Sequence, residues 1–155
     1  MDIDVERARW RTTATYRFHP RLQAGVEFNP EVEEWNPLLS LFLLTETAGR
    51  PAVFLGTSSD RIGSPEGTQS YFATASKRFG TSRFSGYASL NYSEWDRGLN
   101  VPFGMEVGLA DRFSVRPMYD GSRPHVMFNY FRDRWSVSLL AVDLEHPGIS
   151  FAMGF

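Results

Sequence analysis

Hydrophobic and polar residues alternate along most of this chain, and the first clear example lies between residues 8 and 19. Its even positions are mostly apolar or aromatic, and its odd positions are Arg, Thr and His. A period of two predicts a β-strand with one apolar and one polar face, because successive side chains of a strand point to opposite sides. A helix over the same residues would gain no apolar stripe.

The alternation recurs as far as the C-terminus, and it predicts about eleven strands and no helix. Two segments, 37–47 and 51–57, are apolar on both faces, and 70–79 carries Lys77 on its apolar face. The expected strands cover residues 8–19, 22–28, 37–47, 51–57, 70–79, 83–92, 103–110, 112–119, 125–131, 134–142 and 149–155.

Short turns alternate with longer loops between these strands. Gly, Pro, Asn and Asp supply the turn geometry. The short turns are expected at 19–21, 47–50, 79–82, 110–111 and 132–133, and the longer loops at 29–37, 58–67, 93–102, 120–124 and 144–148. This order is that of consecutive antiparallel hairpins. It predicts an all-β, antiparallel up-and-down β-barrel of about 10–12 strands, formed as one domain over residues 1–155.

Aromatic residues gather near both ends of the predicted apolar faces, whereas the middles carry Ala and Val. Those at the short-turn end are Phe18, Phe79, Phe84, Phe113, Tyr130, Trp135 and Phe155. Those at the long-loop end are Phe28, Tyr71, Tyr92, Phe103 and Tyr119. Tyr and Trp favour the interface between lipid and water. Two aromatic belts around an aliphatic middle therefore favour an apolar face that meets lipid over one that fills a soluble core.

Composition excludes several further classes of protein. The 155 residues are 42% hydrophobic and 22% charged, which excludes a disordered chain, and the net charge of −2 predicts no bulk attraction to nucleic acid. The chain has no cysteine, so it forms neither a disulfide nor a thiolate metal site. No apolar run approaches the roughly 18 residues of a membrane helix. Residues 1–10 show no signal peptide, and no motif for a cofactor or metal is present.

The last strand ends in alternating hydrophobic residues, namely Ile149, Phe151, Met153 and Phe155. With the alternating strands and the uneven loops, this ending resembles bacterial outer-membrane β-barrel proteins of the porin-like kind. The resemblance implies a transmembrane protein of a Gram-negative outer membrane, with the lipid bilayer as its surroundings. It also implies that these four residues form the signal that the barrel-assembly machinery reads. Oligomeric state is left open.

One feature departs from that family. Its barrels have an even number of strands and both termini on the periplasmic side, whereas the first strand predicted here begins on the external side. The family pattern therefore implies that a strand and a signal peptide precede this sequence, or that it is the last part of a larger barrel.

The polar face of the expected barrel is rich in arginine. The residues expected to line its lumen are Arg9, Arg11, Arg17, Glu27, Arg83, Glu106, Arg112 and Arg116. If the lumen is open, this bias predicts a passive channel that prefers anions. If Arg–Glu pairs fill it, the protein is a structural membrane barrel. The solute and the state of the lumen are open.

Two further classes stay as alternatives. One is a soluble β-barrel that binds a small ligand. The other is a lipid-modifying enzyme with a Ser–His site at the rim, for which His146, Glu145 and Ser150 are the candidates. His146 precedes Pro147 and is expected to be a turn residue, so no enzyme is predicted. The acidic residues of the long loops are expected to be solvated.

Overall fold

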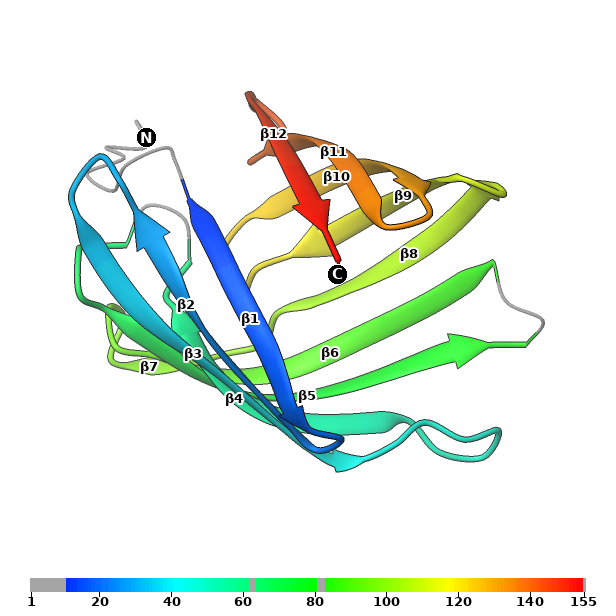
Figure 1. The fold of residues 1–155 in the computed structure, drawn as a ribbon, viewed down its shortest axis with the longest axis horizontal. Coiled ribbons are helices and arrows are strands. Elements are labelled where there is room, and N and C mark those ends of the chain that lie inside the picture. Colours follow the sequence, from blue (N-terminus) through cyan, green and yellow to red (C-terminus); the bar gives the residue numbers. More distant parts are fainter. Residues whose placement is uncertain (1–10, 62–63, 81–82, 155) are drawn as a thin grey trace. The chain divides into compact units, whose positions relative to one another are not determined.

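The computed structural model describes residues 11–61, 64–80 and 83–154, and these contain twelve β-strands and no helix (Figure 1). The strands are β1 (Thr12–His19), β2 (Leu22–Asn29), β3 (Glu34–Leu44), β4 (Ala52–Ser59), β5 (Gln69–Phe79), β6 (Phe84–Ser93), β7 (Gly98–Asn100), β8 (Phe103–Ala110), β9 (Phe113–Tyr119), β10 (Pro124–Arg132), β11 (Trp135–Val142) and β12 (His146–Met153). The predicted all-β class and the strand number are confirmed.

The strands pair antiparallel in sequence order, apart from β7, which pairs with β6 beside the main path. This is the up-and-down order that the alternating turns and loops predict. Register preserves the two faces, since residues of like character lie opposite each other, as with Ala14 and Val26. Register shifts occur between Arg17 and His19 and between Gly108 and Ala110, next to short turns.

The predicted closure of the sheet into a barrel is not observed. The strand order begins at β1 and ends at β12, and within the described ranges each of these two strands has a paired neighbour on one side only. Short turns specify the pairing of consecutive strands, but closure also depends on the tilt and shear of the whole sheet. No local sequence pattern encodes the pairing of β1 with β12 that would close the barrel.

Three predicted boundaries are wrong. β3 begins at Glu34 instead of 37, because Trp35 lies opposite Phe28 and the two rings stack at 4.3 Å. β7 forms inside the loop predicted at 93–102. His146 is the first residue of β12, paired with Val142, and not a turn residue. Pro147 follows in the strand, which is tolerated because β12 is the last strand of the path.

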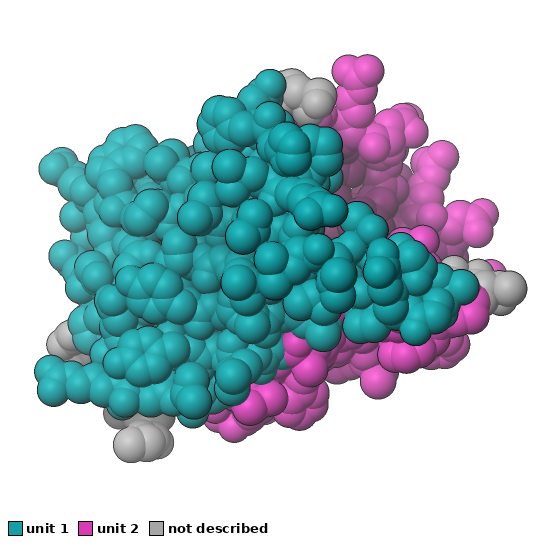
Figure 2. Space-filling view, turned by 90° about the horizontal axis from the view of Figure 1, so that it is seen from below, with its two compact units in different colours: residues 1–75, 89–100 teal, residues 76–88, 101–155 magenta. Residues whose placement is uncertain are grey.

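The chain divides into two compact units (Figure 2). Unit 1 comprises residues 1–75 and 89–100, and unit 2 comprises residues 76–88 and 101–155. Strands β1 to β4 and β7 belong to unit 1, and β8 to β12 belong to unit 2, whereas β5 and β6 contribute to both.

Burial in both units is the reverse of that in a soluble protein. Among the described residues, every buried side chain is polar or charged, including Glu27, Thr74 and Asn129, and no hydrophobic side chain is buried. The large hydrophobic side chains are exposed instead, with Ile149 at 72% and Leu139 at 58%. The apolar face of the alternation is therefore the exposed face.

Candidate functional site

The polar face of unit 2 carries a continuous ladder of side-chain hydrogen bonds over four strands. Ser138 of β11 donates to Asn129 of β10 at 2.7 Å. Asn129 donates through Nδ2 to Ser114 of β9 at 3.0 Å, and Ser114 donates to Oε1 of Glu106 on β8 at 2.9 Å. Register explains the ladder, because Asn129 lies directly opposite both Ser138 and Ser114.

The ladder ends in an ion pair. Arg116 of β9 donates to Oε2 of Glu106 through both Nε, at 3.0 Å, and Nη2. Glu106 therefore accepts from Ser114 on one carboxylate oxygen and from Arg116 on the other. A partly buried carboxylate is stable when it is paired and hydrogen-bonded in this way.

The polar face of unit 1 is also bonded internally. Arg11 lies 3.3 Å from Oε1 of Glu27, whose side chain is almost wholly buried. Gln69 donates to Asn36 at 2.7 Å, and Thr74 and Ser89 share a hydrogen bond of 2.7 Å. Both units therefore satisfy their buried polar groups largely within the chain, as buried polar groups require.

The segments 37–47 and 51–57, which are apolar on both faces, supply phenylalanines to an aromatic cluster in unit 1. Phe42 and Phe54 pack with centroids 5.6 Å apart, and Phe72 meets Phe54 edge to face at 6.1 Å. The guanidinium of Arg17 lies over the ring of Phe42 at 4.9 Å. Phe42 and Phe54 lie directly opposite each other in the ladder between β3 and β4. This aromatic cluster shows why these two strands lack a clean alternation.

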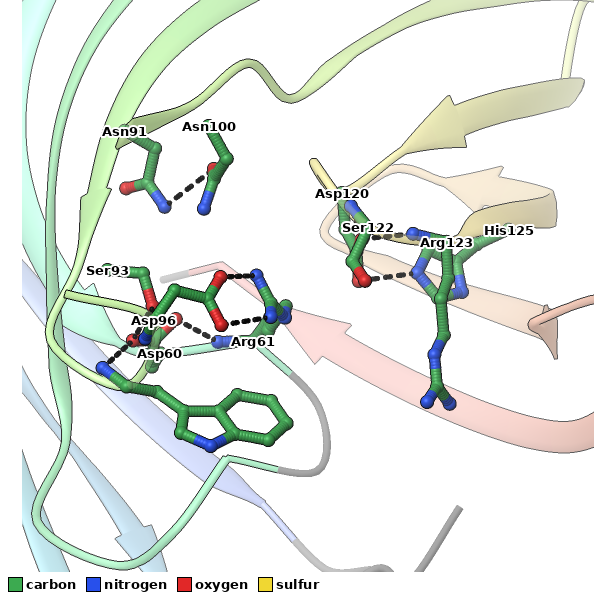
Figure 3. Close-up of polar contacts among 11 residues, drawn as sticks. Asp60, Arg61, Asn91, Ser93, Asp96, Asn100, Asp120, Ser122, Arg123 and His125 are labelled. Carbon is green, nitrogen blue, oxygen red and sulfur yellow. Dashed lines mark hydrogen bonds and ion pairs between the residues drawn. The ribbon is translucent and has the colours of Figure 1, made fainter. Parts of the chain in front are cut away.

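Two connections of unit 1 are joined through a buried carboxylate (Figure 3). Asp60 accepts a hydrogen bond from Ser93 Oγ at 2.6 Å and others from the backbone N–H groups of Arg61 and Trp95. The side chain of Arg61 forms a two-pronged ion pair with Asp96, at 2.5 and 2.7 Å, and lies 4.8 Å from the ring centroid of Trp95. These contacts fix Asp60 and Arg61 against residues 93–96.

Other loop carboxylates are bonded as well, so the expectation that they are merely solvated is wrong for several of them. Glu34 accepts the backbone N–H of Gly67 at 2.6 Å, and Glu94 accepts that of Gln69 at 2.9 Å. The loops of unit 1 are therefore held by carboxylates that satisfy backbone donors. That use leaves these groups less free to serve as ligands.

In unit 2, His125 joins the β9–β10 loop to the β11–β12 loop. Its Nδ1 accepts the backbone N–H of Asp143 at 3.0 Å, and its Nε2 lies 2.9 Å from Oδ2 of Asp120. An Nδ1 that accepts a hydrogen bond carries no proton, so the bond to Asp120 is donated by Nε2–H. Both ring nitrogens are occupied, which leaves neither available as a catalytic base. His125 therefore holds the two loops together by hydrogen bonds, and we call this arrangement the His125 tie (Figure 3).

The charge of Asp120 is stabilised by that tie. Burial opposes ionisation of Asp120. The hydrogen bond from His125 and those from the backbone N–H groups of Arg123 and Ser122 outweigh this effect, and the pKa of Asp120 is lowered from 3.8.

In the turn between β11 and β12, Asp143 and Leu144 both adopt left-handed backbone conformations, with φ of 53° and 60°. Such a pair is uncommon for residues other than glycine. The bond from Asp143 N–H to His125 secures this turn.

The residues expected to line a lumen fall into two groups. Arg11 and Arg116 are paired with Glu27 and Glu106, and Arg17 is stacked on an aromatic ring. Arg83 and Arg112 are exposed and form no ion pair with any described residue. Arg9 lies outside the described residues.

The aromatic residues expected at membrane interfaces are exposed or half-buried wherever the structure describes them. Phe18, Phe79, Phe84, Tyr92, Phe103 and Phe113 are exposed, and Phe28, Tyr119, Tyr130 and Trp135 are half-buried. In the C-terminal pattern, Ile149, Phe151 and Met153 are exposed, and Phe155 lies outside the described residues.

The proposed rim residues are not brought together locally. His146 and Ser150 both belong to β12, and four residues of extended strand separate two side chains by about 13 Å. A hydrogen-bonded Ser–His pair between them would need a bend that β12 does not contain. In the described ranges no group of three or more His, Asp or Glu residues is placed to hold a metal ion.

Several bonded residues were not expected. Ser114, Asn129 and Ser138 occupy the polar positions of their strands, and aligning the hairpins would have placed them in one row. The partnership of Asp60 with Ser93 spans 33 positions of the sequence and has no local signal.

The described residues contain no helix long and apolar enough to cross a membrane. Comparison with known proteins finds no matching family model, no matching curated protein and no matching solved structure.

Proposed function

We propose that this chain is a membrane-spanning β-sheet protein of the outer-membrane barrel type, whose apolar face meets lipid. One observation carries the proposal. Every fully buried side chain among the described residues is polar, whereas large hydrophobic side chains such as Leu139 and Phe151 are exposed. A sheet has this arrangement when its surroundings are apolar and its other face is polar.

The energetics favour lipid over water as the solvent of the apolar face. Each Å² of apolar surface left in water forgoes about 25 cal/mol, and soluble monomers rarely expose extended apolar patches. Here the exposed hydrophobic residues recur at alternate positions of successive strands, as with Phe103 and Met105 of β8. A soluble ligand-binding barrel would instead need these side chains in its core.

The C-terminal strand supports the proposed location in a bacterial outer membrane. Ile149, Phe151 and Met153 share one face of β12 and are 53% to 72% exposed. They are therefore accessible to the barrel-assembly machinery that the resemblance implies, and afterwards to lipid. The membrane location also requires partners for those edges of β1 and β12 that pair with no other strand in the described ranges, since hydrocarbon offers no water to bond their backbone groups.

The absence of cysteine from the sequence allows a direct test of which face meets lipid. Ile149→Cys and Ser150→Cys place a nitroxide label on opposite faces of β12, at positions that are both exposed and so need no repacking. In bilayers, we expect the label at 149 to be accessible to oxygen and shielded from a water-soluble nickel complex. The label at 150 should show the reverse. Equal accessibility of both labels to the nickel complex would remove the proposal.

A second candidate activity is passive passage of anions along the polar face. It is favoured by the charges that remain after pairing. Glu27 and Glu106 are matched by Arg11 and Arg116, whereas Arg83 and Arg112 have no ion-pair partner among the described residues. A lining with this excess of fixed positive charge would select anions. If no such passage exists, the protein is a structural membrane barrel.

A further inference from the structure

Unit 2 contains an open cleft of about 320 Å³ near the end of β5, the start of β6 and the turn that follows β8. Its walls come from Arg78 on β5, from residues 83–85 at the start of β6, and from Glu106 and Gly108 on β8. Asp111, in the turn after β8, completes the lining. Gly108 presents no side chain, so the space beside Arg83 stays open.

Two arginines dominate the chemistry of this cleft. Arg83 is exposed and forms no ion pair with a described residue, and Arg78 enters from the neighbouring strand. A guanidinium offers five N–H donors in a planar fork, a shape that matches the oxygens of phosphate and carboxylate. The hydroxyl of Ser85 adds a further donor to the lining.

The acidic residues of the cleft do not cancel both arginines. Glu106 accepts hydrogen bonds from Ser114 and Arg116 on its two oxygens and also interacts electrostatically with Arg78. With Arg116 included, three arginines still face only two carboxylates, Glu106 and Asp111. Asp111 is exposed and contributes one negative charge. The cleft therefore retains an excess of positive charge.

We propose that this cleft is a binding site for a phosphate-type oxyanion, held mainly by Arg83 with Arg78 and Ser85. The oxyanion occupies the space above Gly108 and receives charge-assisted hydrogen bonds from the guanidinium groups. Its source is either free inorganic phosphate or the phosphate of a lipid headgroup. The site lies wholly within unit 2 and does not depend on the membrane location proposed above.

Three single variants test the assignment by the sign of their effects. Arg83→Gln removes a charged donor and should weaken binding of inorganic phosphate by about tenfold or more. Asp111→Asn removes the repelling carboxylate and should tighten binding by a few-fold. Arg134→Gln is the matched control, since it removes an equal charge from an exposed arginine in the turn between β10 and β11. It should leave binding unchanged.

Isothermal titration of the folded full chain in an uncharged detergent measures these affinities, first with inorganic phosphate. A second arm replaces free phosphate by micelles doped with phosphatidylglycerol. The site, with free phosphate as its source, is supported by saturable binding of inorganic phosphate that is weaker in Arg83→Gln, tighter in Asp111→Asn and unchanged in Arg134→Gln. The same three effects on affinity, seen only with the doped micelles, identify the lipid headgroup as the source. Absence of binding in both arms, or an equal loss in Arg83→Gln and Arg134→Gln, overturns the proposal.

Discussion

Ser93 donates a 2.6 Å hydrogen bond to Oδ2 of Asp60, and both side chains are sealed from solvent at 0% and 1% exposure. Ser93 is the last residue of β6, and Asp60 follows β4, so the bond joins the end of β6 to the connection after β4 within unit 1. A buried carboxylate is tolerated only while its hydrogen bonds are made. The pair is therefore a point at which loop order and stability are coupled.

Replacement of Ser93 by Ala removes the hydroxyl donor to Asp60 and the acceptor of the backbone N–H of Asp96. We expect the free energy of unfolding to fall by about 1–3 kcal/mol. Urea titration of the detergent-solubilised protein measures this. The control is Ser122→Ala, because the Ser122 side chain is exposed in a loop of unit 2. Equal stability of both variants would show that Ser93 does not secure Asp60.

Asn129 links two serines in the polar ladder of unit 2. Asn129→Ala leaves the Ser138 hydroxyl without its acceptor and the Ser114 oxygen without its donor. We expect a loss of about 1–3 kcal/mol in the free energy of unfolding. In the double variant Asn129→Ala/Ser138→Ala, the second substitution should add little, because the shared bond is already lost. Additive losses in this cycle would contradict the ladder.

Asp120 makes the stability of the β9–β10 loop depend on pH. Its pKa in the folded protein is lowered from 3.8, so its contribution is complete above that value and is lost as pH falls through the lower, folded pKa. Asp120→Asn cannot show this dependence. We therefore expect the gap between the urea midpoints of the two proteins to narrow as pH falls from neutral to well below 3.8. A gap that is constant with pH would be the opposite result.

Gly104 of β8 lies directly opposite Tyr87 of β6 and leaves room for its ring. A Cβ at position 104 would lie 2.8 Å from the Tyr87 ring and 3.0 Å from the carbonyl oxygen of Pro117. Gly104→Ala should therefore cost about 1–3 kcal/mol of stability. Gly49→Ala, where a Cβ meets nothing within 4 Å, should cost far less. Adding Tyr87→Ala to Gly104→Ala should recover part of the loss, which a double-mutant cycle would measure.

Strand positions and the two faces could be predicted because both are local properties of the pleat. The alternation around Val26 and Glu27 places one side chain on the exposed face and the other among the buried polar groups. Register was not predicted, since it depends on exact turn lengths and on shifts such as that between Arg17 and His19. The row formed by Ser114, Asn129 and Ser138 depends on register and was missed for that reason.

The contacts between loops could not be predicted from the local sequence. The sequence near Asp60 contains a turn signal, but nothing in it indicates that Ser93 is the partner. β7 was missed for a related reason, because Gly98–Asn100 is only three residues long and pairs with β6 across the 94–97 turn. Asn91 and Asn100 then share a side-chain bond at 3.2 Å. Such short elements depend on tertiary contacts more than on propensity.

If the polar face lines an open pore, its unpaired arginines should set the ion preference. Reconstituted protein should then give ohmic conductance with a preference for anions, since selectivity follows the sign of the fixed lining charges. The double variant Arg83→Gln/Arg112→Gln should reduce the ratio of anion to cation permeability without abolishing conductance. Reversal potentials across planar bilayers in a salt gradient measure that ratio. Arg50→Gln/Arg134→Gln, which removes two exposed arginines from turns, is the charge-matched control and should change the ratio much less. Zero conductance from protein that is folded in the bilayer would remove the channel and leave a structural membrane barrel.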